Sequence, residues 1–248
     1  MDALTDIALA LDPALFAEYV TGYRLDPWQA EAMRSAADRM LFNCARQSGK
    51  SLIAALIALH TATYQPGSLS LLLSPTLRQS QELFRKVKDA FQAVAPGAPS
   101  EAESALRLEL ANGSRVVSLP GQERTVRGYS GVKLLVIDEA ARVANDLYVS
   151  TRPMLAVSGG RLLALSTPFG ARGWWFDAWR GGGDWERYEI DATQCPRISP
   201  EFLAQERRDL GEWWYAQEYM CQFMDAESMA FRQADIEAAF GEVTTWDL

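Results

Sequence analysis

One short stretch near the start of the chain restricts its fold more than any other: Cys44–Ser51, which reads CARQSGKS. It follows the apolar run Met40–Cys44 and precedes Ser51–Thr63, where small and apolar residues recur at helical spacing. Nucleotide phosphates bind in tight loops of this kind, because backbone N–H groups and a helix N-terminus neutralise their charge. The stretch therefore predicts a phosphate-binding loop in an α/β domain.

The residues of this loop have distinct expected roles. Gly49 lets the backbone approach the phosphates closely, Lys50 can reach the β- and γ-phosphates, and the Ser51 hydroxyl can ligate Mg²⁺. Cys44 stands where such loops usually begin with glycine. An ordinary strand-to-helix turn is the alternative interpretation. The predicted nucleotide-binding residues of the loop are Arg46, Gln47, Ser48, Gly49, Lys50 and Ser51.

A second motif supplies carboxylates. Leu134–Glu139 reads LLVIDE, an apolar strand that ends in two acidic residues. Asp138 can hold Mg²⁺ through water, as a strand-end Asp does in phosphoryl-transfer sites. Glu139, just past the strand, is placed to polarise the attacking water as a general base. Two solvated carboxylates are the alternative, but a chain that only binds nucleotide has no need of the second one, so the pair favours hydrolysis.

The remaining core signals indicate a mainly parallel sheet. Ser68–Ser74, Lys133–Asp138 and Arg161–Thr167 are continuous apolar runs, which is typical of strands covered by helices on both faces. An amphipathic helix is expected over Gln79–Val94. Leu106–Leu110 and Arg115–Leu119 alternate in polarity around Asn112-Gly113, which predicts a hairpin.

The C-terminal part of the chain differs from this core. Glu201–Asp225 has a helical pattern rich in Glu, Trp and Tyr. We therefore predict a P-loop core over residues 1–195 and a small helical subdomain over residues 196–248.

Charge and composition exclude some classes of protein. The net charge of the 248 residues is −8, and residues 201–248, with 11 acidic and 3 basic residues, carry all of the excess. The remainder is neutral, which is compatible with a local basic face for DNA. No apolar run approaches the roughly 20 residues that span a bilayer, so no membrane association is expected. The three cysteines, widely spaced and without CxxC pairing, favour a reducing compartment.

The loop sequence ARQSGKS, with Arg-Gln before Ser-Gly-Lys-Ser, resembles that of large terminase subunits, the motors that package DNA into viral capsids. Four further segments are similar to this family in order and spacing over Leu25–Phe240. They are the Trp-Gln segment Leu25–Gln29, the arginine segment Thr125–Gly128, the coupling segment Ser166–Pro168 and the closing helical segment Trp214–Asp225.

The resemblance implies further site residues. Trp28 and Gln29 are expected to contact the adenine, Arg127 to act as an arginine finger on a neighbouring subunit, and Ser166 and Thr167 to couple hydrolysis to movement. Arg46 can instead sense the γ-phosphate within its own subunit, which would make Arg127 a structural partner, or the two arginines can divide the work between subunits. With Glu139 and Lys50, these two arginines are the expected catalytic residues.

The implied fold is that of a RecA-like P-loop NTPase of the ASCE class, and the implied function is ATP hydrolysis that drives double-stranded DNA into a viral procapsid. The expected cofactors are ATP and Mg²⁺. The expected partners are DNA of any sequence, further copies of the chain in a ring, the capsid portal and the small terminase subunit, in the host cytoplasm.

Three other expectations accompany this one. The chain ends near the point where the nuclease domain of large terminases begins, so no nuclease activity is expected. Sequence-independent DNA contact is predicted for Arg78, Lys86, Lys88 and Arg115, with a solvated helix face as the alternative. A helicase or restriction-type translocase lobe and a non-hydrolysing nucleotide-dependent scaffold remain competing functions.

Overall fold

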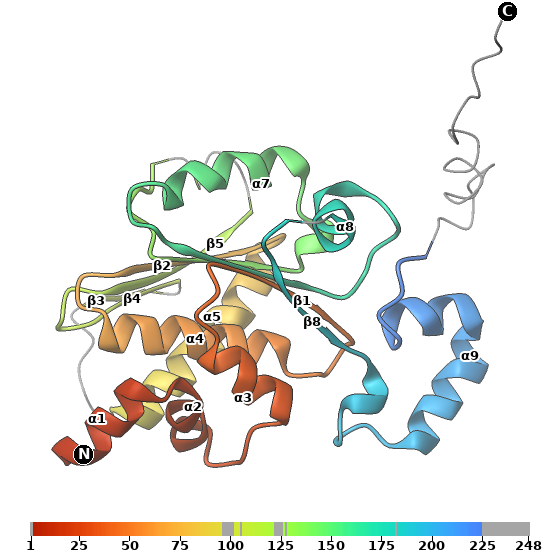
Figure 1. Cartoon of the computed structure of the whole chain (residues 1–248), viewed down its shortest axis with the longest axis horizontal. Coiled ribbons are helices and arrows are strands. Elements are labelled where there is room, and N and C mark those ends of the chain that lie inside the picture. Colours follow the sequence, from red (N-terminus) through yellow and green to blue (C-terminus); the bar gives the residue numbers. More distant parts are fainter. Residues whose placement is uncertain are drawn as a thin grey trace, which may run out of the picture.

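The computed structural model describes residues 2–95, 102–104, 106–121, 126, 128–181 and 183–224 (Figure 1). Its strands are β1 (Arg39–Cys44), β2 (Leu69–Ser74), β3 (Ala102–Ser104), β4 (Arg107–Glu109), β5 (Arg115–Pro120), β6 (Leu134–Asp138), β7 (Arg161–Ser166) and β8 (Glu186–Ile190). They form one eight-stranded sheet in the order β3-β4-β5-β2-β6-β7-β1-β8. Pairing is parallel from β5 to β8 and antiparallel at the β3–β4–β5 end.

Helices cover both faces of this sheet (Figure 1). One face carries α1 (Ala3–Leu11), α2 (Pro13–Thr21), α3 (Pro27–Arg34), α4 (Lys50–Tyr64) and α5 (Leu77–Val94), and the other carries α7 (Asn145–Thr151) and α8 (Gly173–Arg180). Three short 3-10 helices, η1 (Ala140–Arg142), η2 (Arg152–Leu155) and η3 (Ala192–Gln194), lie in the connections, and α9 (Pro200–Glu218) follows the last strand.

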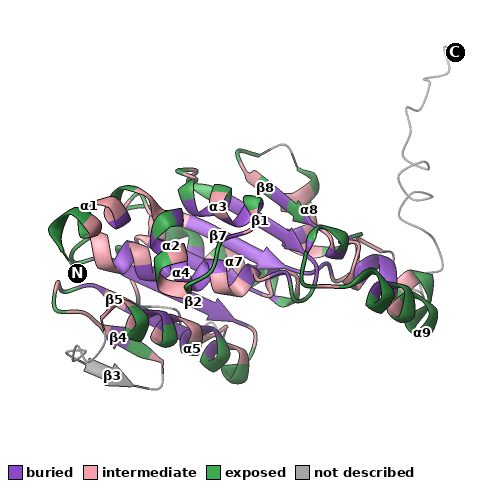
Figure 2. Ribbon diagram, turned by 90° about the horizontal axis from the view of Figure 1, so that it is seen from below, coloured by how far each residue is buried: buried purple, intermediate pink, exposed green. Residues whose placement is uncertain are grey.

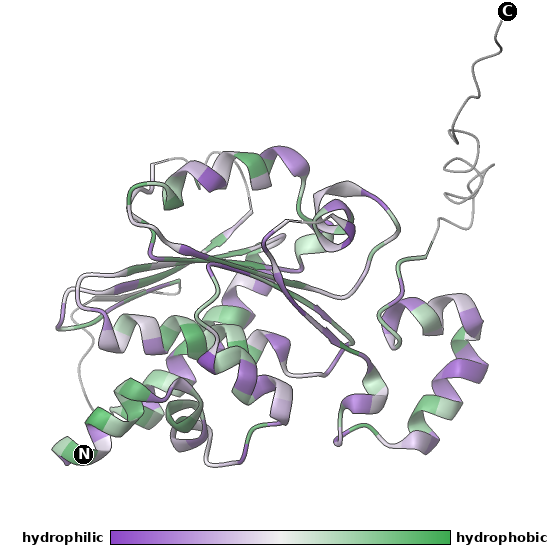
Figure 3. Cartoon of the chain, viewed as in Figure 1, coloured by the Kyte–Doolittle hydropathy of each residue, from purple (hydrophilic) through white to green (hydrophobic). Residues whose placement is uncertain are grey.

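The apolar strands form the core by sending alternate residues to opposite faces. Along β1, Met40 and Phe42 pack under α3 and α4, whereas Leu41 packs towards α7 and α8. Strands β2 and β6 are buried along their whole length, and the central sheet is buried in Figure 2. Figure 3 shows hydrophobic residues on the helices packed against the sheet as well. The predicted α/β fold with a mainly parallel sheet flanked by helices is thus confirmed.

The order of the strands defines the RecA-like class. Strand β7 lies between β1, which leads into the phosphate loop, and β6, which ends in the acidic pair. In open parallel sheets ligands bind at the carboxyl ends of the strands. The ends of β1, β6 and β7 therefore meet at one edge and bring three separate motifs together.

The predicted hairpin is confirmed, with β4 antiparallel to β5 and Gly113 at a φ of 79° in the turn. Strand β8 was not predicted. It alternates between exposed and buried residues at the edge of the sheet, where it pairs in parallel with β1.

The C-terminal helix is shorter than predicted. Helix α9 ends at Glu218, and Gly211 interrupts it with a non-helical φ of 78°. Beyond its end, carbonyl groups accept hydrogen bonds from η3 and β1: the Ala192 N–H donates to the Tyr219 carbonyl at 2.7 Å, and the Asn43 amide donates to the Cys221 carbonyl at 2.9 Å. The helical prediction for residues 219–224 is therefore wrong, and residue 225 lies outside the described residues.

The predicted division at residue 195 stays a prediction, and residues 225–248 of the second part lie outside the described residues. Helix α9 lies beside the three-layered body in Figure 1 and contacts it through a small apolar cluster that contains Ala45, Leu203 and Tyr215. Within the described part of the chain, no helix combines the length and apolar character needed to cross a membrane.

Candidate nucleotide-binding site

The ammonium group of Lys50 occupies the centre of the predicted site. It lies at the first turn of α4, after Gly49 takes a φ of 92° that favours glycine. Its Nζ donates to the Thr167 hydroxyl at 3.2 Å and to the Ala45 carbonyl at 3.5 Å, while Thr167 donates to the Cys44 carbonyl at 3.0 Å. The coupling segment after β7 is thus in direct contact with the phosphate loop.

Lys50 is only 7% exposed, yet no carboxylate within the described residues forms an ion pair with it. A buried charge is costly unless a counter-charge pairs with it. The neutral oxygens of Thr167 and Ala45 accept its hydrogen bonds, and the carboxylate of Asp138 interacts with it electrostatically without forming a direct ion pair. An anion bound in the loop would supply a direct counter-charge.

Ser51 and Asp138 form the second part of the site. The Ser51 hydroxyl donates to Asp138 Oδ1 at 3.4 Å, and the Glu139 N–H donates to the same oxygen at 3.1 Å. Burial, together with the charge of Glu139, raises the pKa of Asp138 to about 6. A hydroxyl beside a carboxylate is the hard oxygen donor set that Mg²⁺ prefers.

Glu139 has an unusual backbone conformation. Its φ of 50° and ψ of 45° lie in the left-handed region, which costs a side-chain-bearing residue about 1–2 kcal/mol. Such outliers persist where the surrounding structure requires them, and functional sites hold many of them. The turn separates the side chain of Glu139, which lines the cavity, from that of Asp138, which is buried behind Ser51.

A cavity of about 600 Å³ opens above the loop. Its walls carry four cations and one carboxylate, a charge balance that suits a polyphosphate. The positions of Lys86 of α5 and Arg142 of η1 in this wall were not predicted, because no sequence motif marks these residues as phosphate-binding. The lining residues are Arg46, Gln47, Gly49, Lys50, Ser51, Leu52, Pro75, Thr76, Gln79, Lys86, Glu139 and Arg142.

Trp28 and Gln29 lie beneath the loop and do not line this cavity. Gln29 is 2% exposed; its amide accepts from the Asp26 N–H at 3.0 Å and donates to the Ser48 carbonyl at 3.3 Å. The Trp28 ring packs edge-on against Phe42 at 5.9 Å. Gln29 therefore supports the loop from below, and the predicted adenine contact of both residues stays a prediction.

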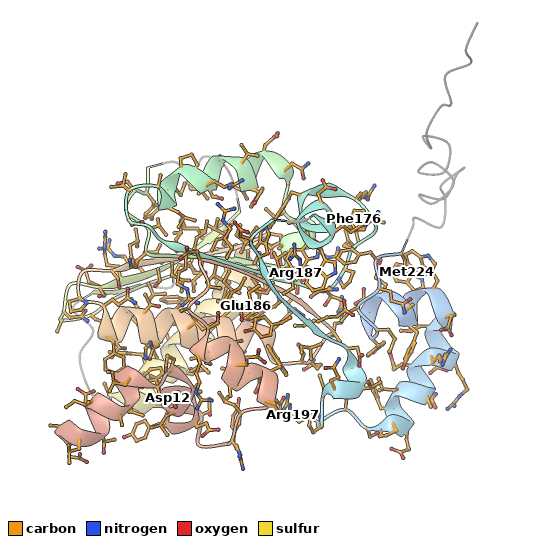
Figure 4. All side chains as sticks on the ribbon, in the orientation of Figure 1. Asp12, Phe176, Glu186, Arg187, Arg197 and Met224 are labelled. Atoms are coloured by element: carbon orange, nitrogen blue, oxygen red, sulfur yellow. The ribbon has the colours of Figure 1, made fainter. Side chains whose placement is uncertain are left out.

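Two ion pairs connect this loop to its surroundings. Arg197, labelled in Figure 4, binds both carboxylate oxygens of Asp26 and reaches the Ser48 carbonyl at 3.4 Å. Arg46 lies in the cavity wall with a side chain 63% exposed, and its Nε pairs with Glu218 of α9 at 2.5 Å. Arg46 thus links the cavity to the C-terminal helix.

The coupling residue Ser166 contacts the segment that follows the acidic strand. The Ser166 hydroxyl accepts a hydrogen bond at 3.2 Å from the N–H of Ala141, which is two residues after Glu139. The same hydroxyl donates to the Thr167 carbonyl at 2.7 Å. Ser166 therefore contacts the turn that carries Glu139, and Thr167 contacts Lys50. Arg127, the predicted finger, lies outside the described residues.

The predicted DNA-contacting cations do not share one surface. Arg78 lies in the first turn of α5, near the carboxyl edge of the sheet, whereas Arg115 begins β5, which is parallel to β2, and so lies near the opposite edge. Lys86 lines the nucleotide cavity, and Lys88 lies on the same helix. The prediction of DNA contact stays a prediction for all four.

Together, the strand order and the loop define a RecA-like P-loop nucleotide-binding domain. The family model described as "Terminase large subunit, T4likevirus-type, N-terminal" matches residues 41–238. The chain therefore belongs to the large terminase family, in agreement with the resemblance of its motifs.

Curated relatives and solved structures are consistent with this assignment. The large terminase subunit of Thermus virus P23-45 is 25% identical over 252 residues, which cover 87% of this chain and 52% of that protein. The chain thus spans about half the length of the curated relatives it matches. The large terminase ATPase domain of Thermus phage P74-26 superposes with a TM-score of 0.73 at 24% identity, over 84% of this chain and 97% of that one. The large terminase of the thermophilic bacteriophage D6E gives 0.69 at 11% identity, over 82% of this chain and 54% of that one. Because both solved structures are less than 25% identical to this chain, their similarity establishes the fold alone.

Proposed function

We propose that this chain binds and hydrolyses ATP to drive double-stranded DNA into a viral procapsid. The observation that carries the proposal is the buried ammonium group of Lys50 at the end of a phosphate loop, which hydrogen-bonds only to neutral oxygens and forms no direct ion pair within the described residues. Membership of the large terminase family favours this function over that of a helicase lobe.

The loop residues bind the nucleotide. Backbone N–H groups of residues 46–51 and the N-terminus of α4 receive the phosphates, and Lys50 compensates their charge. Ser51 and Asp138 hold Mg²⁺, which neutralises charge on the β- and γ-phosphates when bound. The D6E large terminase has been solved in complex with ADP and with ATP-γ-S, which supports ATP as the ligand here.

Glu139 orients the attacking water and accepts its proton. Its side chain projects into the cavity from the left-handed turn, while Asp138 remains behind Ser51, so the two carboxylates have separate tasks. Arg46 in the same wall stabilises the transferring phosphoryl group within its own subunit, and Arg127 does so for a neighbouring subunit. Trp28 and Gln29 contact the adenine once nucleotide is bound.

The proposed motor contains several copies of this chain together with other proteins. We propose a ring of copies, docked on the capsid portal with the small terminase subunit in the host cytoplasm. Ser166 and Thr167 transmit hydrolysis to movement, since they contact both the Glu139 turn and Lys50. We propose that residues 1–195 are the ATPase core and that residues 196–248 are a second subdomain, whose described helix is α9.

Replacement of Lys50 by alanine tests the nucleotide site directly. Charged hydrogen bonds contribute about 1.5–3 kcal/mol, so Lys50→Ala should weaken ATP-γ-S binding about tenfold or more in calorimetry. Lys133→Ala is the matched control, because its ammonium group also contacts a carbonyl, that of Ser158 at 3.4 Å, but outside this site. Equal affinity in the Lys50 variant and the wild type would refute the phosphate site.

DNA contact should depend on salt and not on sequence, because the contacts are to phosphates. Since Lys86 lines the nucleotide cavity, the informative double variant is Arg78→Ala with Lys88→Ala. It should flatten the slope of log K against log salt by about one unit for each phosphate that is no longer neutralised. Arg24→Ala, an exposed cation on the α2–α3 connection, is the control. Sequence-selective binding without salt dependence would contradict the proposal.

A further inference from the structure

Arg142 lies in the wall of the nucleotide cavity, three residues after Glu139 and at the end of η1. Within the described residues its guanidinium forms no ion pair or hydrogen bond. It stacks instead on the ring of Phe169, whose centroid lies 3.9 Å from the guanidinium carbon. Stacking uses the face of a guanidinium group and leaves the N–H groups at its edge available to an anion.

Phe169 belongs to the loop that follows the coupling segment Ser166–Pro168. This loop is hydrogen-bonded to the C-terminal part of the chain. The Gly170 N–H donates to the buried Gln217 amide of α9 at 3.2 Å, and the Ala171 N–H donates to the carbonyl of Met224, labelled in Figure 4, at 3.2 Å. Contacts therefore run without a break from the cavity wall through Phe169 to α9.

We propose that Arg142 binds the terminal phosphate of the nucleotide held by its own chain, and that its stack on Phe169 makes the loop 167–171 respond to that phosphate. The inference rests on the proposed ATP site. Glu139 must face the γ-phosphate to direct water at it, so a cation three residues further along the same wall reaches that phosphate and not the base. The residue is thus a second arginine acting within the subunit, beside Arg46.

Calorimetry with two nucleotides tests the phosphate contact. Arg142→Ala should lower the affinity for Mg·ATP-γ-S about tenfold or more, the loss expected for a charge-assisted hydrogen bond, and leave that for ADP within about twofold. Arg142→Lys should regain part of the lost affinity. Arg152→Ala is the matched control, since its guanidinium lies 5.7 Å from the Tyr148 ring and lines a different cavity, at the amino end of β1. It should bind both nucleotides as the wild type does.

Hydrogen exchange of the Gly170 and Ala171 amides tests the second half of the proposal. Saturating Mg·ATP-γ-S should alter their exchange in the wild type and leave it unaltered in Arg142→Ala and in Phe169→Leu. Phe169→Leu should nevertheless bind ATP-γ-S within a few-fold of the wild type, because the guanidinium remains.

Two results would overturn the inference. An equal loss of ADP and ATP-γ-S affinity in Arg142→Ala would indicate a structural role. Unchanged affinity for both nucleotides in Arg142→Ala would indicate that Arg142 does not contact the nucleotide and binds another anion, such as DNA. Failure of the proposed ATP site would look different from either result. In that case the wild-type chain itself would bind neither nucleotide, before any variant is compared with it.

Discussion

Glu139→Gln should bind ATP with the affinity of the wild type and lose turnover by about 10²–10⁴, the contribution typical of a general base. The physical reason is the loss of a proton acceptor for the attacking water without a change in shape. The Glu139 side chain is half-buried at the cavity wall and accepts no hydrogen bond from the other described residues, so the variant should remain folded. Phosphate release and ATP-γ-S calorimetry, measured on the same sample, separate turnover from binding.

Glu189→Gln is the control for this substitution, because it makes the same change on an exposed residue of β8. It should hydrolyse ATP at the wild-type rate. If Glu139→Gln did so too, the general base would be another group. The assignment of Asp138 and Glu139 to separate tasks would then be wrong.

Arg127→Ala should bind ATP normally and lose turnover by about 10³–10⁵, the contribution typical of arginine fingers that act on a transferring phosphoryl group. The prediction rests on the position of Thr125–Gly128 before β6, as in the large terminase family. If the finger acts on the nucleotide of a neighbouring subunit, as proposed, the affinity of the chain for its own ATP should persist.

Mixing two inactive variants distinguishes action between subunits from action within one. A ring that contains both Arg127→Ala and Glu139→Gln can pair an intact Glu139 with an intact Arg127 from the adjacent copy, so activity should return. If mixtures remained inactive although the subunits co-assembled, Arg127 would act within its own subunit or only in the fold. Arg46 would then be the better candidate.

Much of the core was predictable because its strands are covered on both faces. Burial on both sides requires continuous apolar runs, and these runs predicted β1, β2, β6 and β7 to within one or two residues. The edge strand β8 was not predictable in this way because one face is exposed, which leaves an alternating, partly charged sequence. Its pairing with β1 is a tertiary contact that no local pattern encodes.

The site was predictable where one motif carries the chemistry and unpredictable where the fold brings distant side chains together. Lys50, Ser51, Asp138 and Glu139 belong to two short motifs, and the structure places them around one loop. Lys86 and Arg142 reach the same cavity from α5 and η1, whose sequences carry no phosphate motif. The roles of Gln29 and Arg197 beneath the loop likewise depend on tertiary hydrogen bonds.

ATP hydrolysis in this cavity, with an arginine supplied by a second copy, is tested most directly by phosphate release from Mg·ATP over a dilution series. The wild-type chain and Glu139→Gln are measured at the same concentrations. We predict slow release per chain at high dilution, a steep rise as copies associate, and no rise for Glu139→Gln. A wild-type chain that binds Mg·ATP-γ-S but releases no phosphate at any concentration would contradict this prediction and indicate a nucleotide-dependent scaffold.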